Sequence, residues 1–210
     1  MRIAERRPEV IKTDPEGNFD DAVKRAAEIL LAGGLVAYPT ESFYGLAVDA
    51  TNEGAIAQLF KIKGRDPGQP ILLLIQSKEI PENWVCQIPT IAQELIEKYW
   101  PGGLTLVFEA GPAVSPLLTA GTGKIGIRCS SHPMARALAR EVAVPITGTS
   151  ANVSGKSPCG SAEEVIEALG GGVGLVLDGG RTQGQKASTI LDVTVEPPRI
   201  LRQGLLEPVF

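Results

Sequence analysis

Short, continuous apolar segments alternate with helical patterns along this chain, and this alternation constrains its fold more than any other feature. Helical spacing covers residues 18–31, 52–62, 90–100, 133–141 and 161–169. Apolar runs typical of strands cover 35–38, 71–75, 104–108, 125–127, 145–147, 173–177, 189–193 and 199–201. Successive side chains of a strand point to opposite faces of its sheet, so a continuously apolar strand is buried on both. The sequence therefore predicts an α/β fold with helices covering both faces of a sheet.

Local signals predict where several helices begin and end. Asn18 and Ser161 precede helical patterns as expected N-caps, and Ser131 is expected to cap a helix that begins at Pro133. Gly33 follows the first helix, where glycine is favoured. His132 is the only histidine in the chain, and we expect it to belong to a cap region rather than to serve as a general base.

Length and composition limit the domain organisation and the partners. With 210 residues, 43% of them hydrophobic, the chain can bury one sizeable core. We expect a leader over residues 1–17, one domain over 18–206 and a tail over 207–210. The net charge of −4 argues against a wide basic surface for nucleic acid, so any phosphate site must be local.

The cysteines and the apolar runs predict where the protein resides. Three cysteines without ligand or disulfide spacing fit a reducing compartment. The first residues lack the apolar core of a signal peptide, and no apolar run approaches the length that crosses a bilayer. We expect a soluble, cytoplasmic protein with no membrane partner.

Two polar segments beside predicted strands carry candidate chemistry. In PITGTSANVSGKSP, Ser150 and Asn152 follow an apolar run and would lie at the carboxyl edge of a sheet, where α/β proteins bind ligands. A Ser/Asn-rich turn is the alternative. In KIKGRDPGQP, Lys63 and Arg65 precede another run, and a solvated basic face is the alternative there. Together the segments supply the cations and fixed donors that bind phosphate.

Further polar residues stand at the ends of other predicted strands, and common catalytic patterns are missing. These residues are Thr40, Glu41, Arg128, Ser188 and Arg202. The segment GTGK at 121–124 lacks the earlier glycine of a phosphate loop, and no histidine, cysteine and carboxylate cluster has zinc-ligand spacing. Many cations and hydroxyls without an obvious base favour phosphoryl or nucleotidyl transfer, which depends mainly on positioning and charge stabilisation.

Seven segments in a fixed order resemble the YrdC/Sua5 family of threonylcarbamoyl-AMP synthases. They are YPTESFYGLAVDA, KIKGRDPGQPILLLI, WPGGLTLVF, IGIRCSSHP, PITGTSANVSGKSPC, DGG followed by ASTILD, and ILRQG. These segments lie between residues 38 and 204, within a resemblance that covers about residues 20 to 204. The resemblance implies a single YrdC-like domain, in the family's short form, with a twisted mixed sheet and a concave ligand-binding cleft.

The resemblance also implies a reaction and its partners. L-Threonine, bicarbonate or CO2, and ATP would form threonylcarbamoyl-AMP and pyrophosphate, which is a nucleotidyl transfer. Mg²⁺ would accompany ATP and be held mainly through phosphate oxygens and waters, with no metal site on the protein. A downstream transferase would use the product for N6-threonylcarbamoylation of adenosine 37 in tRNA.

Site residues follow from the resemblance by position. The implied catalytic set is Lys63, Arg65, Ser150 and Asn152. The implied threonine contacts are Thr40, Arg128, Gly148 and Ser188, with Gly148 contributing backbone only. The implied nucleotide contacts are Arg65, Gln69, Lys124, Ser150, Pro158 and Arg202.

Two other functions stay open on the sequence alone. The same fold could serve as a noncatalytic module that binds RNA weakly; the lysine and arginine rim favours this and the acidic balance opposes it. It could also be a carbamoyl-transfer partner domain of a larger enzyme, which the single-domain length disfavours.

Overall fold

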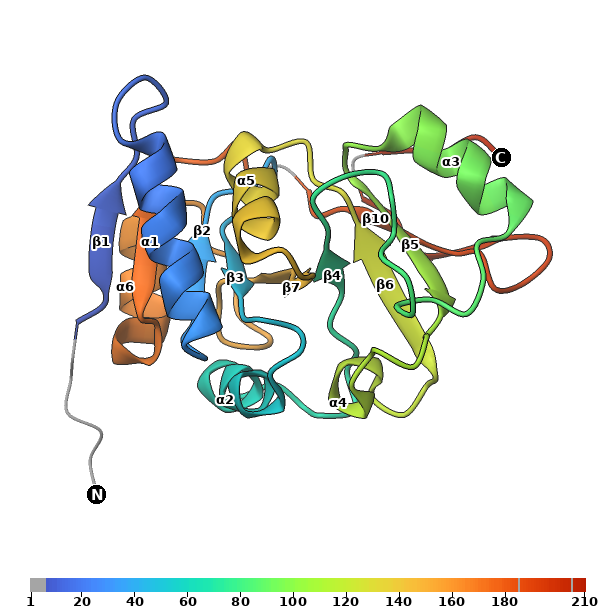
Figure 1. Cartoon of the computed structure of the whole chain (residues 1–210), viewed down its shortest axis with the longest axis horizontal. Coiled ribbons are helices and arrows are strands. Elements are labelled where there is room, and N and C mark those ends of the chain that lie inside the picture. The colour runs from blue at the N-terminus through green and yellow to red at the C-terminus, as the bar shows by residue number, and fades with distance from the viewer. Residues whose placement is uncertain (1–6, 185, 205) are drawn as a thin grey trace.

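The computed structural model describes residues 7–184, 186–204 and 206–210, which form two β-sheets with helices packed against them (Figure 1). The helices are α1 (Phe19–Leu31), α2 (Glu53–Lys63), α3 (Thr90–Tyr99), α4 (Pro116–Thr119), α5 (Pro133–Val142) and α6 (Ala162–Leu169), followed by a 3-10 turn, η1 (Gly170–Gly172). The expected mixed α/β class is confirmed.

The first sheet has five strands in the order β1-β9-β2-β3-β8. Their bounds are β1 (Glu9–Lys12), β2 (Val36–Tyr38), β3 (Gly45–Ala47), β8 (Thr149–Ser150) and β9 (Leu175–Asp178). Strand β9 runs parallel to both β1 and β2, whereas β3 runs antiparallel to β2 and to β8. This sheet is therefore mixed.

The second sheet has six strands in the order β11-β10-β5-β6-β4-β7. Their bounds are β4 (Leu73–Leu74), β5 (Leu104–Glu109), β6 (Lys124–Arg128), β7 (Ile146–Thr147), β10 (Thr189–Asp192) and β11 (Arg199–Arg202). Strands β10 and β5 are parallel, as are β4 and β6, while the other neighbours are antiparallel.

The chain passes from one sheet to the other at Gly148, which alone separates β7 from β8. The first sheet reaches the second here, because the Thr147 amide donates to the Val48 carbonyl oxygen at 3.0 Å and Asp49 forms an antiparallel bridge with Ile146. The mixed strand pairing that we expected in one sheet is thus divided between two. The division leaves space between them for a ligand site.

Strand β2 shows why the apolar runs are continuous. Val36, Ala37 and Tyr38 are all fully buried. Val36 and Tyr38 pack in a core cluster with α1 and α5, whereas Ala37 joins a larger cluster that includes α2, α3 and α6. The period of two along the strand thus separates two apolar cores, one on each face.

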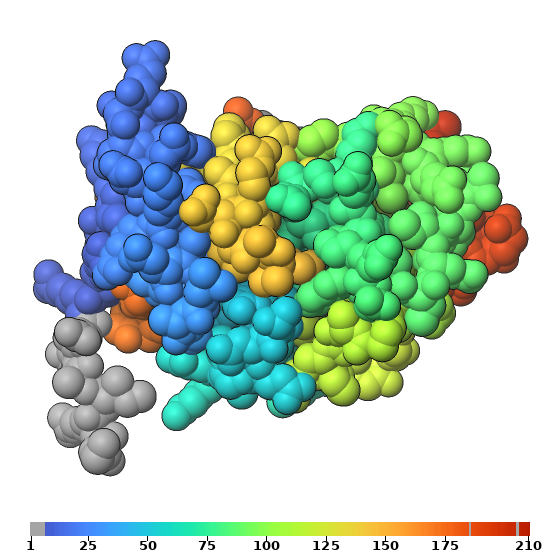
Figure 2. Space-filling model, viewed as in Figure 1, coloured from blue at the N-terminus to red at the C-terminus, as the bar shows by residue number. Residues whose placement is uncertain are grey.

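Helices α1 and α5 pack against one another, and α1 contacts β9 and β2 of the first sheet while α5 contacts β4 of the second. Figure 2 shows their surfaces, blue and yellow, side by side on one face of the molecule. The buried side chains of α1 recur every three or four residues, at Ala22, Val23, Ala26, Ala27 and Leu30. The helix ends at Leu31, and Gly33 lies just past its end as predicted, with a φ of 82° that suits glycine.

One of the three expected helix caps is wrong, and another lacks its side-chain bond. Asn18 is the N-cap residue of α1 as predicted, but its side chain accepts from the Asp14 amide at 2.9 Å and makes no hydrogen bond to the helix. His132, rather than Ser131, is the N-cap of α5, and its Nδ1 accepts from the Met134 amide at 3.2 Å. Ser161 caps α6 as predicted.

Two strand predictions also need correction. The expected strand at 71–75 is reduced to Leu73–Leu74, the two residues that pair with both β6 and β7. Strand β1 lies within the predicted leader, whose first six residues are outside the described part of the chain. The sequence pattern did not predict a strand at Glu9–Lys12, because this edge strand is mostly exposed and has no apolar pattern.

The described part of the chain contains no helix with the length and apolar composition needed to cross a membrane. Cys86, Cys129 and Cys159 are free thiols.

Candidate active site

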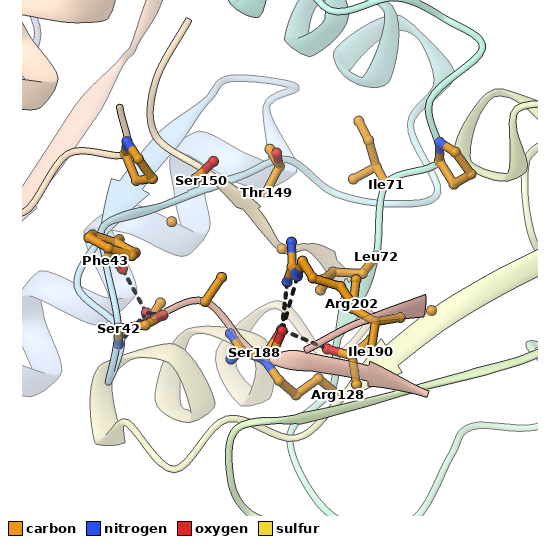
Figure 3. Close-up of a pocket in the computed structure, with 18 of the residues that line it drawn as sticks. Ser42, Phe43, Ile71, Leu72, Arg128, Thr149, Ser150, Ser188, Ile190 and Arg202 are labelled. Atoms are coloured by element: carbon orange, nitrogen blue, oxygen red, sulfur yellow. Dashed lines mark hydrogen bonds between the residues drawn. The ribbon is translucent and has the colours of Figure 1, made fainter. Parts of the chain in front are cut away.

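A cavity of about 490 Å³ is lined by residues of both sheets and of the loops between them (Figure 3). It brings together nine of the twelve residues implied by the resemblance. They are Thr40, Arg65, Lys124, Arg128, Gly148, Ser150, Pro158, Ser188 and Arg202. Strand ends that are far apart in sequence therefore meet at one site, as the repeated polar residues at those ends predicted.

Arg128, the last residue of β6, is almost completely buried and is held by a carboxylate. Its Nη1 donates to Glu41 Oε1 at 2.5 Å, and Ser130 Oγ donates to the other carboxylate oxygen at 2.5 Å. Burial alone would raise the pKa of Glu41, but the Arg128 charge and the Ser130 hydrogen bond outweigh burial and lower that pKa. Glu41 is therefore ionised, and Arg128 has a fixed partner.

Arg202, at the end of β11, is held by backbone rather than by a carboxylate. Its Nε and Nη2 donate to the Ser188 carbonyl oxygen at 3.1 and 2.9 Å, and Nη2 also lies 3.1 Å from Ser188 Oγ (Figure 3). The Ser188 hydroxyl lies 3.0 Å from Thr105 Oγ1. Burial lowers the pKa of Arg202, and the charges of Arg128 and Arg65 lower it further. The three guanidinium groups thus act on one another electrostatically across the site.

Arg65 and Lys124 supply the other two cations of the lining. Arg65 donates to the carbonyl oxygens of Pro70 at 2.8 Å and Gln69 at 3.3 Å, and burial lowers its pKa. Lys124 Nζ lies 3.0 Å from the Asp192 carboxylate, which is largely buried. Arg65 is therefore held by carbonyl oxygens, whereas the charge of Lys124 is paired with a carboxylate.

The structure corrects the expected position of Lys63. This side chain is 1% exposed and does not line the cavity. Its Nζ lies behind the loop after β8, where it donates to the carbonyl oxygens of Ser150 and Asn152, the second at 2.7 Å. Burial, together with the Arg65 charge, lowers the pKa of Lys63 to about 8. The solvated-face alternative is therefore wrong for Lys63, and its implied catalytic role stays a prediction.

Asn152 and Gln69 also lie outside the cavity lining. Asn152 Oδ1 accepts from Ser150 Oγ at 2.5 Å, and its Nδ2 donates to the Lys156 carbonyl oxygen at 2.7 Å, so its side chain organises the loop. The Gln69 side chain is exposed, and its carbonyl oxygen accepts from Arg65. Neither side chain occupies the position expected of a ligand contact.

Gly148 allows the loop to pass closely beside β4. A Cβ on Gly148 would clash with Leu72 Cδ1 and lie 2.9 Å from Leu74 Cγ, and its amide already donates to the Leu72 carbonyl oxygen at 2.8 Å. The Gly148 amide is therefore already hydrogen-bonded within the protein. Gly148 contributes to the shape of the cavity because it has no side chain.

Sequence reasoning missed several lining residues, notably Ser42, Phe43, Tyr38 and Thr122. Ser42 and Phe43 belong to the loop between β2 and β3, where Thr40 Oγ1 donates to the Phe43 carbonyl oxygen at 2.6 Å. Their position just after Thr40 was an available signal. The burial of the Tyr38 ring beside the cavity had no such signal, because it depends on packing.

The charges of the lining define what the cavity can bind. Four cationic side chains reach it, and none of its described lining residues is an aspartate or glutamate. Hydroxyls and apolar side chains complete the wall, among them Phe43, Ile71, Leu72, Ile190 and Leu201. A ligand with several negative charges and an apolar portion matches this surface.

The lining does not match the ligand preferences of Mg²⁺. The ion prefers carboxylate and water oxygens in octahedral geometry, and the described lining offers no carboxylate. Within residues 7–184, 186–204 and 206–210, no three histidine, cysteine or acidic side chains gather as metal ligands. The residues present do not fit a protein-held magnesium ion.

Comparisons with known proteins place the chain in a family. The family model for Sua5, YciO and YrdC, described as "Telomere recombination", matches residues 28–204. The chain is 37% identical over 193 residues to threonylcarbamoyl-AMP synthase of Bacillus subtilis, covering 91% of this chain and 56% of that protein. It is 39% identical over 191 residues to a putative threonylcarbamoyl-AMP synthase of Mycobacterium tuberculosis, covering 91% of this chain and 87% of that protein.

A solved structure matches in the same way. The crystal structure of Pyrococcus abyssi Sua5 complexed with L-threonine superposes with a TM-score of 0.87 at 35% sequence identity, covering 93% of this chain and 57% of that chain. This chain thus spans a little over half the length of the B. subtilis and P. abyssi proteins. The resemblance drawn from the seven sequence segments is confirmed at the level of family and fold.

Proposed function

The chain belongs to the Sua5/YciO/YrdC family, and from that membership we propose that it is a threonylcarbamoyl-AMP synthase. L-Threonine, bicarbonate or CO2, and ATP are its substrates, and threonylcarbamoyl-AMP and pyrophosphate are its products. One observation carries the proposal: four cations and several hydroxyls from distant strand ends converge on a cavity with no acidic residue in its described lining. Such a site favours charge stabilisation over proton abstraction.

The threonine end of the cavity is built around Arg128. Its planar guanidinium matches a carboxylate, and the hydroxyls of Thr40 and Ser188 lie in the same lining. The neutral amine of threonine attacks CO2 through its nitrogen lone pair and releases a proton to water, which gives a carbamate. Arg128 orients the amino acid, and the apolar part of the wall limits water that would compete with the carbamate oxygen.

The nucleotide end is built around Arg65, Arg202, Lys124 and Ser150. The carbamate oxygen attacks the α-phosphorus of ATP, the bond from that phosphorus to the bridging oxygen breaks, and pyrophosphate leaves with the electron pair. The cations stabilise the charge that grows on the phosphate oxygens. Magnesium enters as the counter-ion of ATP, bound to its phosphates, and no protein residue is assigned to it.

Lys63 and Asn152 act indirectly in this scheme. Both hold the loop that carries Ser150, through the carbonyl contacts of Lys63 and the Asn152 Oδ1 contact with Ser150 Oγ. The product is an activated carbamoyl donor. We infer that a downstream transferase uses it for N6-threonylcarbamoylation of adenosine in tRNA, as the family membership suggests.

A reconstitution assay tests the proposal. The protein is incubated with ATP, L-threonine, bicarbonate and Mg²⁺, pyrophosphate release is followed, and the adenylate is identified by mass spectrometry. Pyrophosphate should depend on both threonine and bicarbonate. Pyrophosphate release that ignores threonine, or no release with folded protein, contradicts the proposal.

A pair of variants on one strand sharpens the assay. Arg202→Ala removes a cavity cation, whereas Arg199→Ala removes an exposed arginine from the other end of β11, outside the lining. Loss of a charged group that contacts phosphate costs about 2 kcal/mol or more, so only the Arg202 variant should lose most of its turnover. Equal activities of the two variants would contradict the assignment of Arg202 to the nucleotide site.

A further inference from the structure

We propose that Glu41 is a positioning residue that fixes Arg128, so that the free edge of the guanidinium faces the ligand cavity. Glu41 is not part of the cavity lining, although its neighbour Thr40 and its partner Arg128 both are. Its role therefore has to be exerted through Arg128. The kinetic part of this inference rests on the proposed synthase function, whereas the conformational part does not.

The first step is the connection that Glu41 makes. It lies in the loop after β2 of the first sheet, and its two carboxylate oxygens bind Arg128 at the end of β6 and Ser130 just beyond, both beside the second sheet. Arg128 and Ser130 are 5% and 1% exposed, so these contacts are shielded from water. One carboxylate thus ties together the two sheets whose residues form the cavity wall.

The second step concerns the part of Arg128 that Glu41 leaves free. Glu41 occupies Nη1, while Nε is buried and has no hydrogen-bond partner among the described residues. Nε itself is closed off from the cavity, so the group that meets an anionic ligand is Nη2, which makes no hydrogen bond among the described residues and is not shut off in this way, while Glu41 keeps Nη1.

The third step is that Arg128 would not keep this position unaided. Arg202 and Arg65 bring positive charge to the same cavity, and the Arg128 charge lowers the pKa of Arg202. Mutual repulsion therefore favours rotation of Arg128 away from the site. The ionised Glu41 carboxylate opposes that rotation at short range, where a largely buried charge pair is little screened by salt.

An opposite role for Glu41 makes a different prediction. If Glu41 competed with the ligand for Arg128, its removal would strengthen ligand binding. If Glu41 positions Arg128, its removal weakens binding, because the guanidinium is then free to leave its orientation. The sign of the change in threonine affinity separates the two.

The test compares Glu41→Gln with wild type and with a control, Glu97→Gln. The glutamine side chain keeps the shape and a hydrogen-bonding oxygen but loses the charge, and Glu97 is an exposed partner of Lys78 at 2.6 Å, outside the lining. With ATP saturating, the threonine KM of Glu41→Gln should rise roughly 10-fold, as expected for loss of a charge-assisted contact. Its kcat and its KM for ATP should stay near those of wild type, its thermal midpoint should fall because the buried Arg128 charge loses its partner, and Glu41→Asp should recover part of both losses.

A second readout does not depend on activity. The side-chain Nε–Hε resonance of Arg128, assigned by its absence from Arg128→Lys, is recorded by NMR without ligand. A fixed guanidinium gives a dispersed, slowly exchanging signal in wild type and Glu97→Gln, and Glu41→Gln should lose it.

The outcomes separate the two proposals. A wild-type protein without synthase activity but with the NMR difference defeats the synthase function and leaves the positioning role standing. An active wild type whose Glu41→Gln variant keeps its threonine KM, or binds threonine more tightly, overturns the positioning role. An unchanged Arg128 signal in Glu41→Gln overturns it as well.

Discussion

Replacing Lys63 with methionine should make the protein's stability respond differently to pH. Lys63 is buried at the end of α2, and its ammonium group donates to the carbonyl oxygens of Ser150 and Asn152. Methionine keeps a similar length and removes both the charge and the donors. Two opposing effects follow, and they depend differently on pH.

The magnitudes can be worked out from the contacts. Loss of the donors leaves two backbone carbonyls without a partner, at roughly 1–3 kcal/mol each. Burial lowers the Lys63 pKa from 10.5 to about 8. That shift corresponds to a penalty on the order of 3 kcal/mol for holding the charge in the folded state. At pH 7 methionine avoids the cost of the buried charge but leaves the two carbonyl oxygens unpaired. These two changes in the free energy of unfolding have opposite signs and largely cancel.

The sign of the pH dependence follows from which state binds the proton. Between pH 8 and 10.5, Lys63 is largely neutral in the folded state but protonated in the unfolded state, so the unfolded state binds more protons and wild-type stability gains from rising pH. The neutral amine still has donors for both carbonyls. The Lys63→Met variant cannot make this gain, so its deficit relative to wild type should grow by up to about 3 kcal/mol across that range.

Urea unfolding at pH 7, 8, 9 and 10 measures the difference directly, with Lys61→Met as control because Lys61 is exposed on the same helix. Other groups that titrate, such as tyrosines and cysteines, are present in all three proteins and cancel in the comparison. A difference between wild type and Lys63→Met that stays constant with pH would refute a depressed Lys63 pKa. A constant and negligible difference would also refute the carbonyl contacts.

Three further predictions concern other parts of the fold. Arg128→Lys keeps the charge but loses the planar fork, so threonine KM should rise while ATP affinity by calorimetry stays near wild type; the reverse result would place Arg128 with the phosphates. Gly148→Ala forces a Cβ against Leu72 and Leu74 and should lower urea stability by roughly 1–3 kcal/mol. Gly103→Ala, with nothing within 4 Å of the new Cβ, should not do so. Ser161→Ala should cost about 1 kcal/mol through its lost helix cap with unchanged synthase rate, and a slower rate would connect α6 to the cavity.

Sequence periodicity predicted the buried elements well and the exposed edges poorly. The spacing over 18–31 and the glycine after it predicted α1 to within a residue, because burial of one face and a left-handed C-terminus are local requirements. Strand β1 had no such requirement, since it is an edge strand held to β9 by backbone pairing. The division into two sheets depends on the passage of the chain from β7 to β8 at Gly148. The hydrophobic pattern of the sequence does not indicate this passage.

In the candidate site, the sequence predicted which strand ends converge but not the direction of every side chain. Residues at strand ends were predicted to converge, and Arg128, Ser188 and Arg202 do so, because strand direction places them at one edge. The direction of a long side chain is set by packing instead. Lys63 and Arg65 are two residues apart, yet the first is buried behind the Ser150 loop and the second reaches the cavity. Spacing alone could not distinguish them.

The partners of the four cavity cations suggest how the ligand is divided between them. Arg65 and Arg202 are held by oxygens of uncharged groups, which fix their orientation without neutralising them. Arg128 and Lys124 are paired with carboxylates outside the lining. The unneutralised pair suits the multiply charged phosphates, whereas Arg128, already balanced by Glu41, suits a single carboxylate that needs geometry more than net charge. On this basis salt should weaken ATP binding more steeply than threonine binding, because screening acts most on the charges that lack a nearby partner.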